Sequence, residues 1–207
     1  MNNHQPANAW LCTAGAVFLL TTTTAVATLQ PRDLNGDTTI DAFYDQDLNI
    51  TWLRDANVNG LMDWATAVKW AQDFSFGGFT YWRLPSSDTC VGFFCTGSEM
   101  GHLWSVELGN TAGRLLTNAG EFQNISLQTG GFWSGTEVAG NTNNAWIFYH
   151  YYGNQYISNK VSQLQAMAVR SGDIPAVPES KTALLLLAGL AVLALSRAKA
   201  KQEVGND

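Results

Sequence analysis

Residues 145–158 read AWIFYHYYGNQYIS, an aromatic segment followed by a Gly-Asn pair and a second, shorter extended segment. Aromatic residues favour β-strands, and a Gly-Asn pair favours a tight reversal of the chain. The stretch therefore predicts a β-hairpin with strands over residues 145–152 and 155–158 and a turn at residues 153–154. Both faces of the first strand carry apolar or aromatic side chains, so we expect one face to lie against the core.

Helical spacing precedes this hairpin in the chain. Asp63 is the expected N-cap of a helix that reaches about residue 74. Its buried face consists of four residues at helical spacing: Trp64, Ala67, Val68 and Ala71. Ser98 and Glu99 begin a second expected helix, which ends near residue 108.

Three further short strands are expected, over residues 48–53, 79–84 and 165–170. Helical patterns lie mainly in the first half of the chain and strand patterns mainly in the second. This order predicts a single α+β domain, in which two helices pack beside an antiparallel sheet.

The ends of the chain differ in composition from this domain. Residues 9–20 are apolar and lead to Ala25-Val26-Ala27, a pattern typical of a cleaved signal peptide. Near the other end an apolar run is followed by basic residues, as in a membrane segment whose basic side stays in the cytoplasm. The chain then divides into five expected parts: a signal peptide (1–27), the domain (28–172), a linker (173–181), a transmembrane helix (182–196) and a basic cytoplasmic tail (197–207).

Removal of the signal peptide leaves two cysteines, Cys90 and Cys95. In an exported protein an even pair so close in sequence predicts a disulfide. The alternative is two free buried thiols. A zinc site is disfavoured because no second pair of Cys or His completes it.

Charge and motifs limit the function classes. The net charge is −6, without the clustered cations that nucleic-acid binding needs, so no nucleic-acid partner is expected. The chain has no G-x-S-x-G, H-E-x-x-H or phosphate-binding glycine loop. Glu99 and His102 have the spacing of a shared helical face, suited to a metal or to proton transfer, but surface or packing roles are the commoner use of such a pair. We therefore predict a protein that is not an enzyme.

An acidic stretch precedes the first expected strand. Its oxygen-bearing residues have spacing that resembles part of an EF-hand calcium loop: Asp33, Asn35, Asp37 and Asp41. Thr38 occupies the position of the usual glycine, and Tyr44 that of the usual acidic ligand. We expect a solvated Asx-rich turn, with Ca²⁺ as the alternative and as the sole cofactor that the sequence suggests.

Aromatic side chains of the hairpin offer flat surfaces for stacking on sugars. The candidate ligand-binding residues are Trp146, Tyr149, Tyr151 and Tyr156. The alternative is cross-strand packing, the commoner use of such residues.

Several motifs in order along the chain resemble the Lcl C-terminal-domain family of bacterial surface domains. They are YDQDLNITWLRDANV (44–58), MDWATAVKWA (62–71), WRLPS (82–86), FWSGT (132–136) and AVR (168–170). The resemblance covers residues 40–172. It implies a C-type-lectin-like fold and an adhesive or glycan-binding module, with no catalytic residues. The WRLP motif is shared with formylglycine-generating-type enzymes, whose catalytic cysteine arrangement this chain does not match.

The C-terminal region resembles a PEP-CTERM sorting signal, the substrate of an exosortase in Gram-negative bacteria. The motif residues are Val177, Pro178 and Glu179, with Ser180 in place of a second proline, and the basic end consists of Arg197, Lys199 and Lys201. The apolar run, Ala183 to Leu195, is about 20 Å long as a helix, shorter than a bilayer core of about 30 Å. A temporary anchor needs no optimal span, and a retained C-terminal anchor is the alternative.

Together these patterns predict a non-enzymatic protein that the Sec machinery exports. It passes through an inner-membrane intermediate, meets an exosortase, and reaches the cell surface or extracellular matrix. Its expected ligand is polysaccharide or matrix material. The alternatives are a structural biofilm component without a defined ligand site, and a relative of the formylglycine-generating enzymes.

Overall fold

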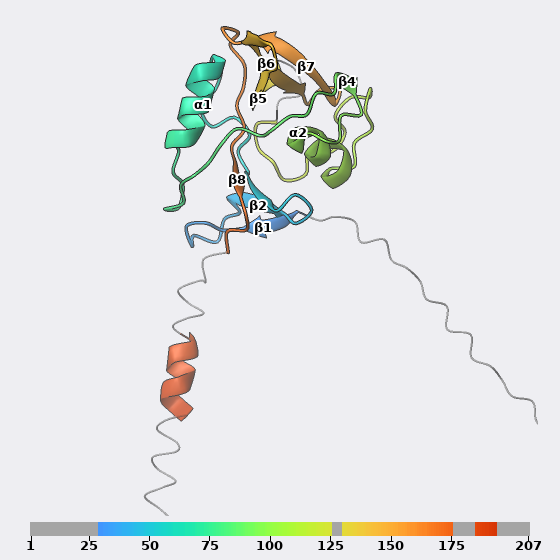
Figure 1. Ribbon diagram of the computed structural model, residues 1–207. Coiled ribbons are helices and arrows are strands. Elements are labelled where there is room, and N and C mark those ends of the chain that lie inside the picture. The colour runs from blue at the N-terminus through green and yellow to red at the C-terminus, as the bar shows by residue number, and fades with distance from the viewer. Residues whose placement is uncertain (1–28, 126–129, 176–184, 194–207) are drawn as a thin grey trace, which may run out of the picture.

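The computed structural model describes residues 29–125, 130–175 and 185–193 (Figure 1). Its strands form two antiparallel four-stranded sheets, which confirms the α+β class. The first sheet has the order β1-β2-β3-β8, with β1 (Gln30–Arg32), β2 (Ala42–Asp45), β3 (Ile50–Leu53) and β8 (Val169–Ser171). The second has the order β4-β7-β6-β5, with β4 (Gly92–Phe93), β5 (Phe132–Val138), β6 (Asn141–Tyr149) and β7 (Asn154–Asn159).

Both expected helices are present. Helix α1 (Trp64–Asp73) begins where the sequence predicts, because the Asp63 carboxylate accepts a hydrogen bond of 2.8 Å from the Thr66 amide. Helix α2 (Glu99–His102) starts after Ser98, whose hydroxyl accepts from the Gly101 amide at 3.1 Å. The chain then widens into a π-helical turn, η1 (Leu103–Glu107), so the predicted second helix is a composite of two helix types.

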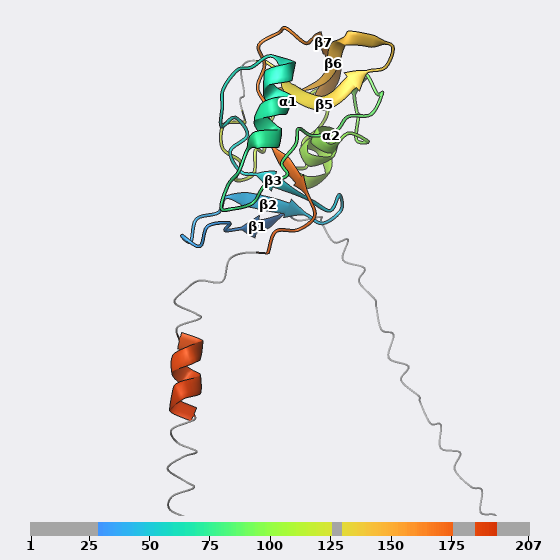
Figure 2. The ribbon, with the colours of Figure 1, turned by 60° about the vertical axis from the view of Figure 1, so that its left-hand side comes forward.

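The second sheet is covered on both faces. Phe132 and Phe148 lie in the cluster that includes Met100 and Leu103 from the α2–η1 segment. Their neighbours along the strands, Trp133 and Ile147, belong instead to the cluster that contains Ala67 and Ala71 of α1. Figure 2 shows α1 lying along the β5–β6 side of this sheet. Both faces of the hairpin base are therefore in the core.

The hairpin is confirmed, but its turn is longer than predicted. Strand β6 ends at Tyr149, opposite Asn154, and residues 150–153 form a four-residue loop rather than a two-residue turn. The carbonyls of Tyr151 and Tyr152 accept hydrogen bonds from the amides of Leu116 and Gly113, each at 3.0 Å. A separate loop thus takes the carbonyls that the predicted strand end at residues 151 and 152 would have used.

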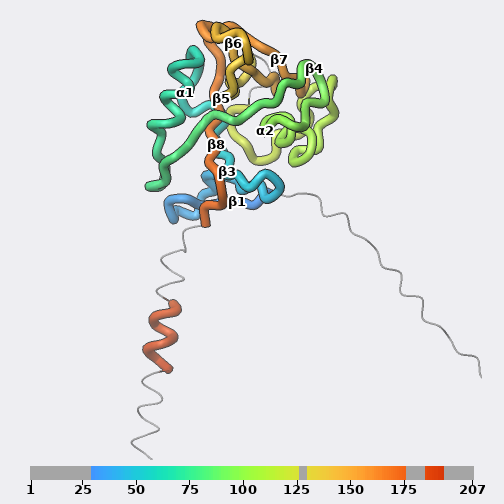
Figure 3. Tube along the Cα trace, viewed as in Figure 1, coloured from blue at the N-terminus to red at the C-terminus, as the bar shows by residue number. Residues whose placement is uncertain are grey.

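The predicted strand over residues 79–84 is wrong, because this segment contributes only isolated bridges, at Phe79 and Arg83. Arg83 exchanges two 2.8 Å backbone hydrogen bonds with Val169, and no further ladder forms. Pro85 follows, and proline cannot donate to a ladder. The segment instead runs as an extended connection between α1 and β4, as the tube in Figure 3 shows. The strand expected over residues 165–170 begins later, at Val169.

The folded domain extends slightly past its predicted boundary at residue 172. Ile174 is fully buried, in a cluster with Leu34 and Trp82, and Asp173 forms an ion pair of 2.8 Å with Arg32. Residues 173 and 174 thus belong to the domain rather than to the linker.

Most of the predicted terminal features lie outside the described residues. These are the signal peptide, the sorting motif at residues 177–179 and the basic tail. Within the predicted transmembrane segment the structure describes one helix, over residues 185–193, with exposed side chains. Among all described residues, no helix is both long and apolar enough to cross a bilayer.

Candidate functional site

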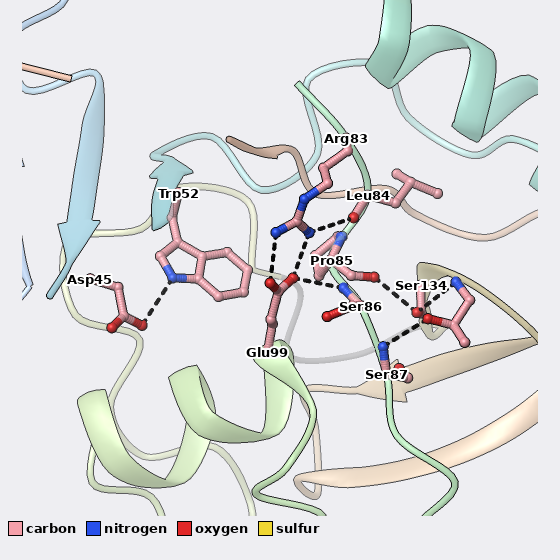
Figure 4. Close-up of polar contacts among 10 residues, drawn as sticks. Asp45, Trp52, Arg83, Leu84, Pro85, Ser86, Ser87, Glu99 and Ser134 are labelled. Atoms are coloured by element: carbon pink, nitrogen blue, oxygen red, sulfur yellow. Dashed lines mark hydrogen bonds and ion pairs between the residues drawn. The ribbon is translucent and has the colours of Figure 1, made fainter. Parts of the chain in front are cut away.

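The segment 82–86 is held on one side by an ion pair with α2. Two nitrogens of the Arg83 guanidinium donate to the two oxygens of Glu99, both at 2.7 Å. The Ser86 amide donates to the same carboxylate, also at 2.7 Å (Figure 4). Trp82 points the other way and is buried, with its indole donating to the Phe79 carbonyl at 3.0 Å. Arg83 is therefore fixed in place rather than free to swing.

The same segment is joined on its other side to the start of β5. The Pro85 carbonyl accepts from the Gly135 amide at 2.8 Å and from the buried Ser134 hydroxyl at 2.9 Å. The Ser87 amide donates to the Thr136 hydroxyl at 3.0 Å. Residues 82–86 and 132–136, some fifty positions apart in sequence, thus form one hydrogen-bonded unit (Figure 4).

A pocket of about 300 Å³ opens between this unit and α1. Its lining combines an apolar floor, three neutral polar side chains and the fixed guanidinium: Val68, Leu84, Gln72, Ser86, Thr136 and Arg83, with Gly135. Sites for small ligands start at about this volume and use a few polar groups on an apolar surface. Gln72 and Ser86 are exposed, and neither side chain forms a hydrogen bond with the rest of the described chain. Both are therefore free to contact a ligand.

The order of the sequence motifs agrees with a comparison against known families. A family model for the Lcl C-terminal domain matches residues 41–170, more than half of the chain. The chain belongs to the Lcl C-terminal domain family. A search of curated proteins finds no match.

The four aromatic candidates of this Lcl domain fall into different environments. Trp146 is buried, with 6% of its surface exposed. Tyr149 is half-buried and meets the more exposed Tyr156 edge to face, with ring centres 6.2 Å apart. Tyr151, in the loop, packs against Tyr152 at 4.4 Å. The structure therefore brings together only one pair from the predicted set, and places Trp146 in the interior.

The acidic loop, most of which precedes the residues matched by the family model, is a network of Asx turns. Asp33 accepts from the amides of Asn35, Gly36 and Thr38 at 2.7–3.1 Å. Asn35 and Asp37 accept in the same way from amides two residues ahead. These bonds explain the loop without an ion. One carboxylate oxygen each of Asp33, Asp37 and Asp41 nevertheless lies within 4.8 Å of the others, so calcium binding stays a prediction.

Hydrogen bonds from backbone amides lower the pKa of these acids, whereas burial raises it. At Asp37 the Thr39 amide, assisted by side-chain hydrogen bonds, lowers the pKa below its usual value. At Asp41 burial raises the pKa, and the charges of Asp37 and Asp33 add to this effect. The pKa of Asp33 is lowered as well, so among the three acids only Asp41 has a raised pKa.

The predicted disulfide of the Lcl domain is confirmed. Cys90 and Cys95 are bonded, with Cα atoms 5.4 Å apart. The bridge closes a short loop that carries three apolar side chains, of which Val91 and Phe94 are well exposed. The side chain of Gln155, on β7, donates to the Cys90 carbonyl at 2.7 Å and so fastens this loop to the second sheet.

Glu99 and His102 have separate partners, so the functional pair that the sequence left as the less common interpretation does not form. Glu99 is engaged by Arg83, while His102 faces Asp45 and Glu107, two residues that sequence reasoning did not connect with it. Gln72 and Ser86 of the pocket were also missed. They carry no motif signal, and only the packing of α1 beside residues 82–86 brings them together.

Proposed function

We propose that this protein is an exported, non-enzymatic surface protein whose Lcl domain binds polysaccharide. The observation that carries the proposal is the pocket beside Arg83, where neutral hydrogen-bonding groups surround an immobilised guanidinium. Sugar hydroxyl groups both donate and accept hydrogen bonds, so polar side chains with unused hydrogen-bonding capacity suit them. A pocket of about 300 Å³ suits one unit of a longer chain that continues past the opening.

The chemistry of the lining favours a sugar over a simple anion. Arg83 has both of its outer nitrogens committed to Glu99, which offsets its charge. Gln72, Ser86 and Thr136 offer amide and hydroxyl groups that both donate and accept, as sugar hydroxyls do. The Tyr149–Tyr156 pair is a second candidate contact, where exposed ring surface is available for stacking. A C-type-lectin-like relationship would agree with this role.

The proposed location rests on both ends of the chain and on the disulfide. A bridge between Cys90 and Cys95 persists in oxidising compartments, outside the cytoplasm. The signal-like residues 1–27 would direct export through Sec, and Val177-Pro178-Glu179 would direct an exosortase to the membrane-held intermediate. Mass spectrometry of surface material should then find the tail removed near Glu179, and an intact C-terminus would argue for a permanent anchor.

A glycan array tests the binding proposal. The full-length chain, in mild detergent, should show saturable binding to at least one polysaccharide, with and without added calcium. Gln72→Ala and Ser86→Ala should each weaken that binding, because they remove hydrogen-bonding groups without breaking a contact within the chain. Ser75→Ala is the matched control, since Ser75 is exposed near the end of α1 but does not line the pocket.

Two outcomes of this experiment would contradict the proposed binding site or the proposed role. If Tyr156→Ala abolishes binding while the pocket variants do not, the tyrosine pair is the binding surface. If no glycan binds saturably in either condition, the lectin-like role fails, and a structural role in the matrix becomes the better explanation.

A further inference from the structure

Three potential metal ligands from two distant parts of the chain meet where the end of β2 approaches the α2–η1 segment. Asp45 ends β2, His102 ends α2, and Glu107 ends η1. Nε2 of His102 lies 3.5 Å from a Glu107 oxygen and 3.9 Å from an Asp45 oxygen. One ligand atom from each of the three residues lies within 4.8 Å of the others.

The two carboxylates are almost completely enclosed. The side chain of Asp45 is 0% exposed and that of Glu107 is 1% exposed, while His102 is 14% exposed. The remaining Glu107 oxygen, Oε2, is buried without any hydrogen-bond partner, and so is Nε2 of His102. An unpaired buried carboxylate oxygen is costly, and native proteins retain few of them without a reason.

The charge of the cluster is also unbalanced. In the part of the chain that the structure describes, no Lys or Arg forms an ion pair with Asp45 or Glu107. Two ionised carboxylates beside a single imidazole would leave excess negative charge in an enclosed site, and a divalent cation would neutralise it.

The backbone holds the ligands in position. Residues five apart on an α-helix lie about 140° apart around the axis, so His102 and Glu107 would diverge. The π-turn, closed by the Leu108 amide donating to the Leu103 carbonyl at 2.9 Å, widens the helix and lets the two side chains meet. Such turns occur frequently at functional sites.

Asp45 is oriented by a second set of bonds. Its Oδ1 accepts from the Leu48 amide at 3.0 Å, and its Oδ2 accepts from the Trp52 indole at 3.4 Å (Figure 4). Partners of this kind fix the direction of a ligating carboxylate. The oxygen that faces His102 is therefore held in place before any ion arrives.

We propose that Asp45, His102 and Glu107 bind a single divalent transition-metal ion. Zinc-like ions bind oxygen and nitrogen ligands at about 2.0–2.2 Å, so two ligands of one ion lie at most about 4.4 Å apart. The distances of 3.5 and 3.9 Å from Nε2 satisfy this limit. Imidazole with two carboxylates suits such an ion better than Ca²⁺, which prefers six or more oxygens. This site is independent of the proposed glycan pocket.

Zinc titration of the full-length chain tests the proposal. After chelator treatment, calorimetry should show one equivalent of Zn²⁺ bound through this cluster. Glu107→Gln and His102→Gln should each raise its Kd at least tenfold, because each removes one of three ligands. Asp37→Asn in the acidic loop is the matched control and should change that Kd less than twofold. Cys12 and His4 are present in every variant, so the differences isolate the cluster.

Co²⁺ provides a second measurement on the unmodified chain, in case a variant fails to fold. Its visible spectrum should show bands of nitrogen and oxygen coordination that Zn²⁺ displaces, without a thiolate charge-transfer band. The proposal is overturned if the wild-type chain binds no Zn²⁺, if Glu107→Gln binds as tightly as wild type, or if only Asp37→Asn loses binding.

Discussion

Arg83 and Glu99 form a two-pronged ion pair that ties the extended segment after α1 to the first residue of α2. Both hydrogen bonds are 2.7 Å long, and the Ser86 amide adds a third bond to the same carboxylate. The Glu99 side chain is 13% exposed and that of Arg83 is 36% exposed. The arginine of the WRLP motif thus has a structural role and forms one wall of the pocket, and its guanidinium is not free to move toward a bound molecule.

Replacing Glu99 by Gln should lower the free energy of unfolding by about 2 kcal/mol. The loss combines a partly buried charge pair with a charge-assisted bond to the Ser86 amide. Urea denaturation measures it. The matched control is Asp73→Asn, which breaks the exposed Lys69–Asp73 pair and should cost less than about 0.5 kcal/mol. Equal losses of unfolding free energy from the two changes would show that the Arg83–Glu99 pair stabilises the protein no more than an exposed ion pair does.

Removal of the disulfide should destabilise the domain by about 2 kcal/mol. Cys90 and Cys95 are five positions apart, and closing so short a loop restricts the unfolded chain only modestly. The double variant Cys90→Ala, Cys95→Ala should therefore still fold, with a lower urea midpoint than the oxidised wild type. Wild-type protein with a reducing agent should unfold at the same midpoint as the variant without one. A loss of 4 kcal/mol or more would mean that the bridge also organises β4.

Local signals in the sequence predicted the helices well. Asp63 and Ser98 are helix caps whose side chains each accept from the amide three residues ahead, and such contacts depend only on neighbouring residues. The limits of the hairpin could not be predicted in this way. Strand β6 stops at Tyr149, and the carbonyls of residues 150–152 accept hydrogen bonds from Trp104 and from residues 113–116, which lie 35 or more positions earlier in the chain.

The candidate sites show the same contrast between contacts that are local in sequence and contacts between distant segments. The disulfide and the Asx loop involve residues close in sequence, and both were predictable. The partners of His102 were not predictable. Helical spacing places His102 near Glu99, but the π-turn brings it to Glu107 instead. Asp45 lies at the end of β2, far from His102 in sequence, so only the tertiary structure reveals that the two residues are close.

His150 is the buried histidine of the hairpin loop. It is 1% exposed, packs edge to face on Phe132 and Phe148, and has no hydrogen-bond partner at either ring nitrogen. Burial lowers its pKa from 6.5 to about 3. The folded protein therefore keeps this ring neutral at pH values where the unfolded chain protonates it.

This difference predicts an acid-dependent loss of stability. Between pH 6.5 and about 3 the unfolded state binds one more proton at His150 than the folded state does, so the free energy of unfolding falls as pH falls. Each pH unit well below 6.5 costs about 1.4 kcal/mol, which gives about 2–3 kcal/mol at pH 4.5. His150→Leu removes the titrating group and suits the apolar surroundings. Urea denaturation from pH 7.5 to 4.5 should show a wild-type-minus-variant difference that is flat above pH 7 and moves against the wild type below 6.5. A difference that stays constant across the whole range would mean that His150 finds a proton-accepting partner in the folded state.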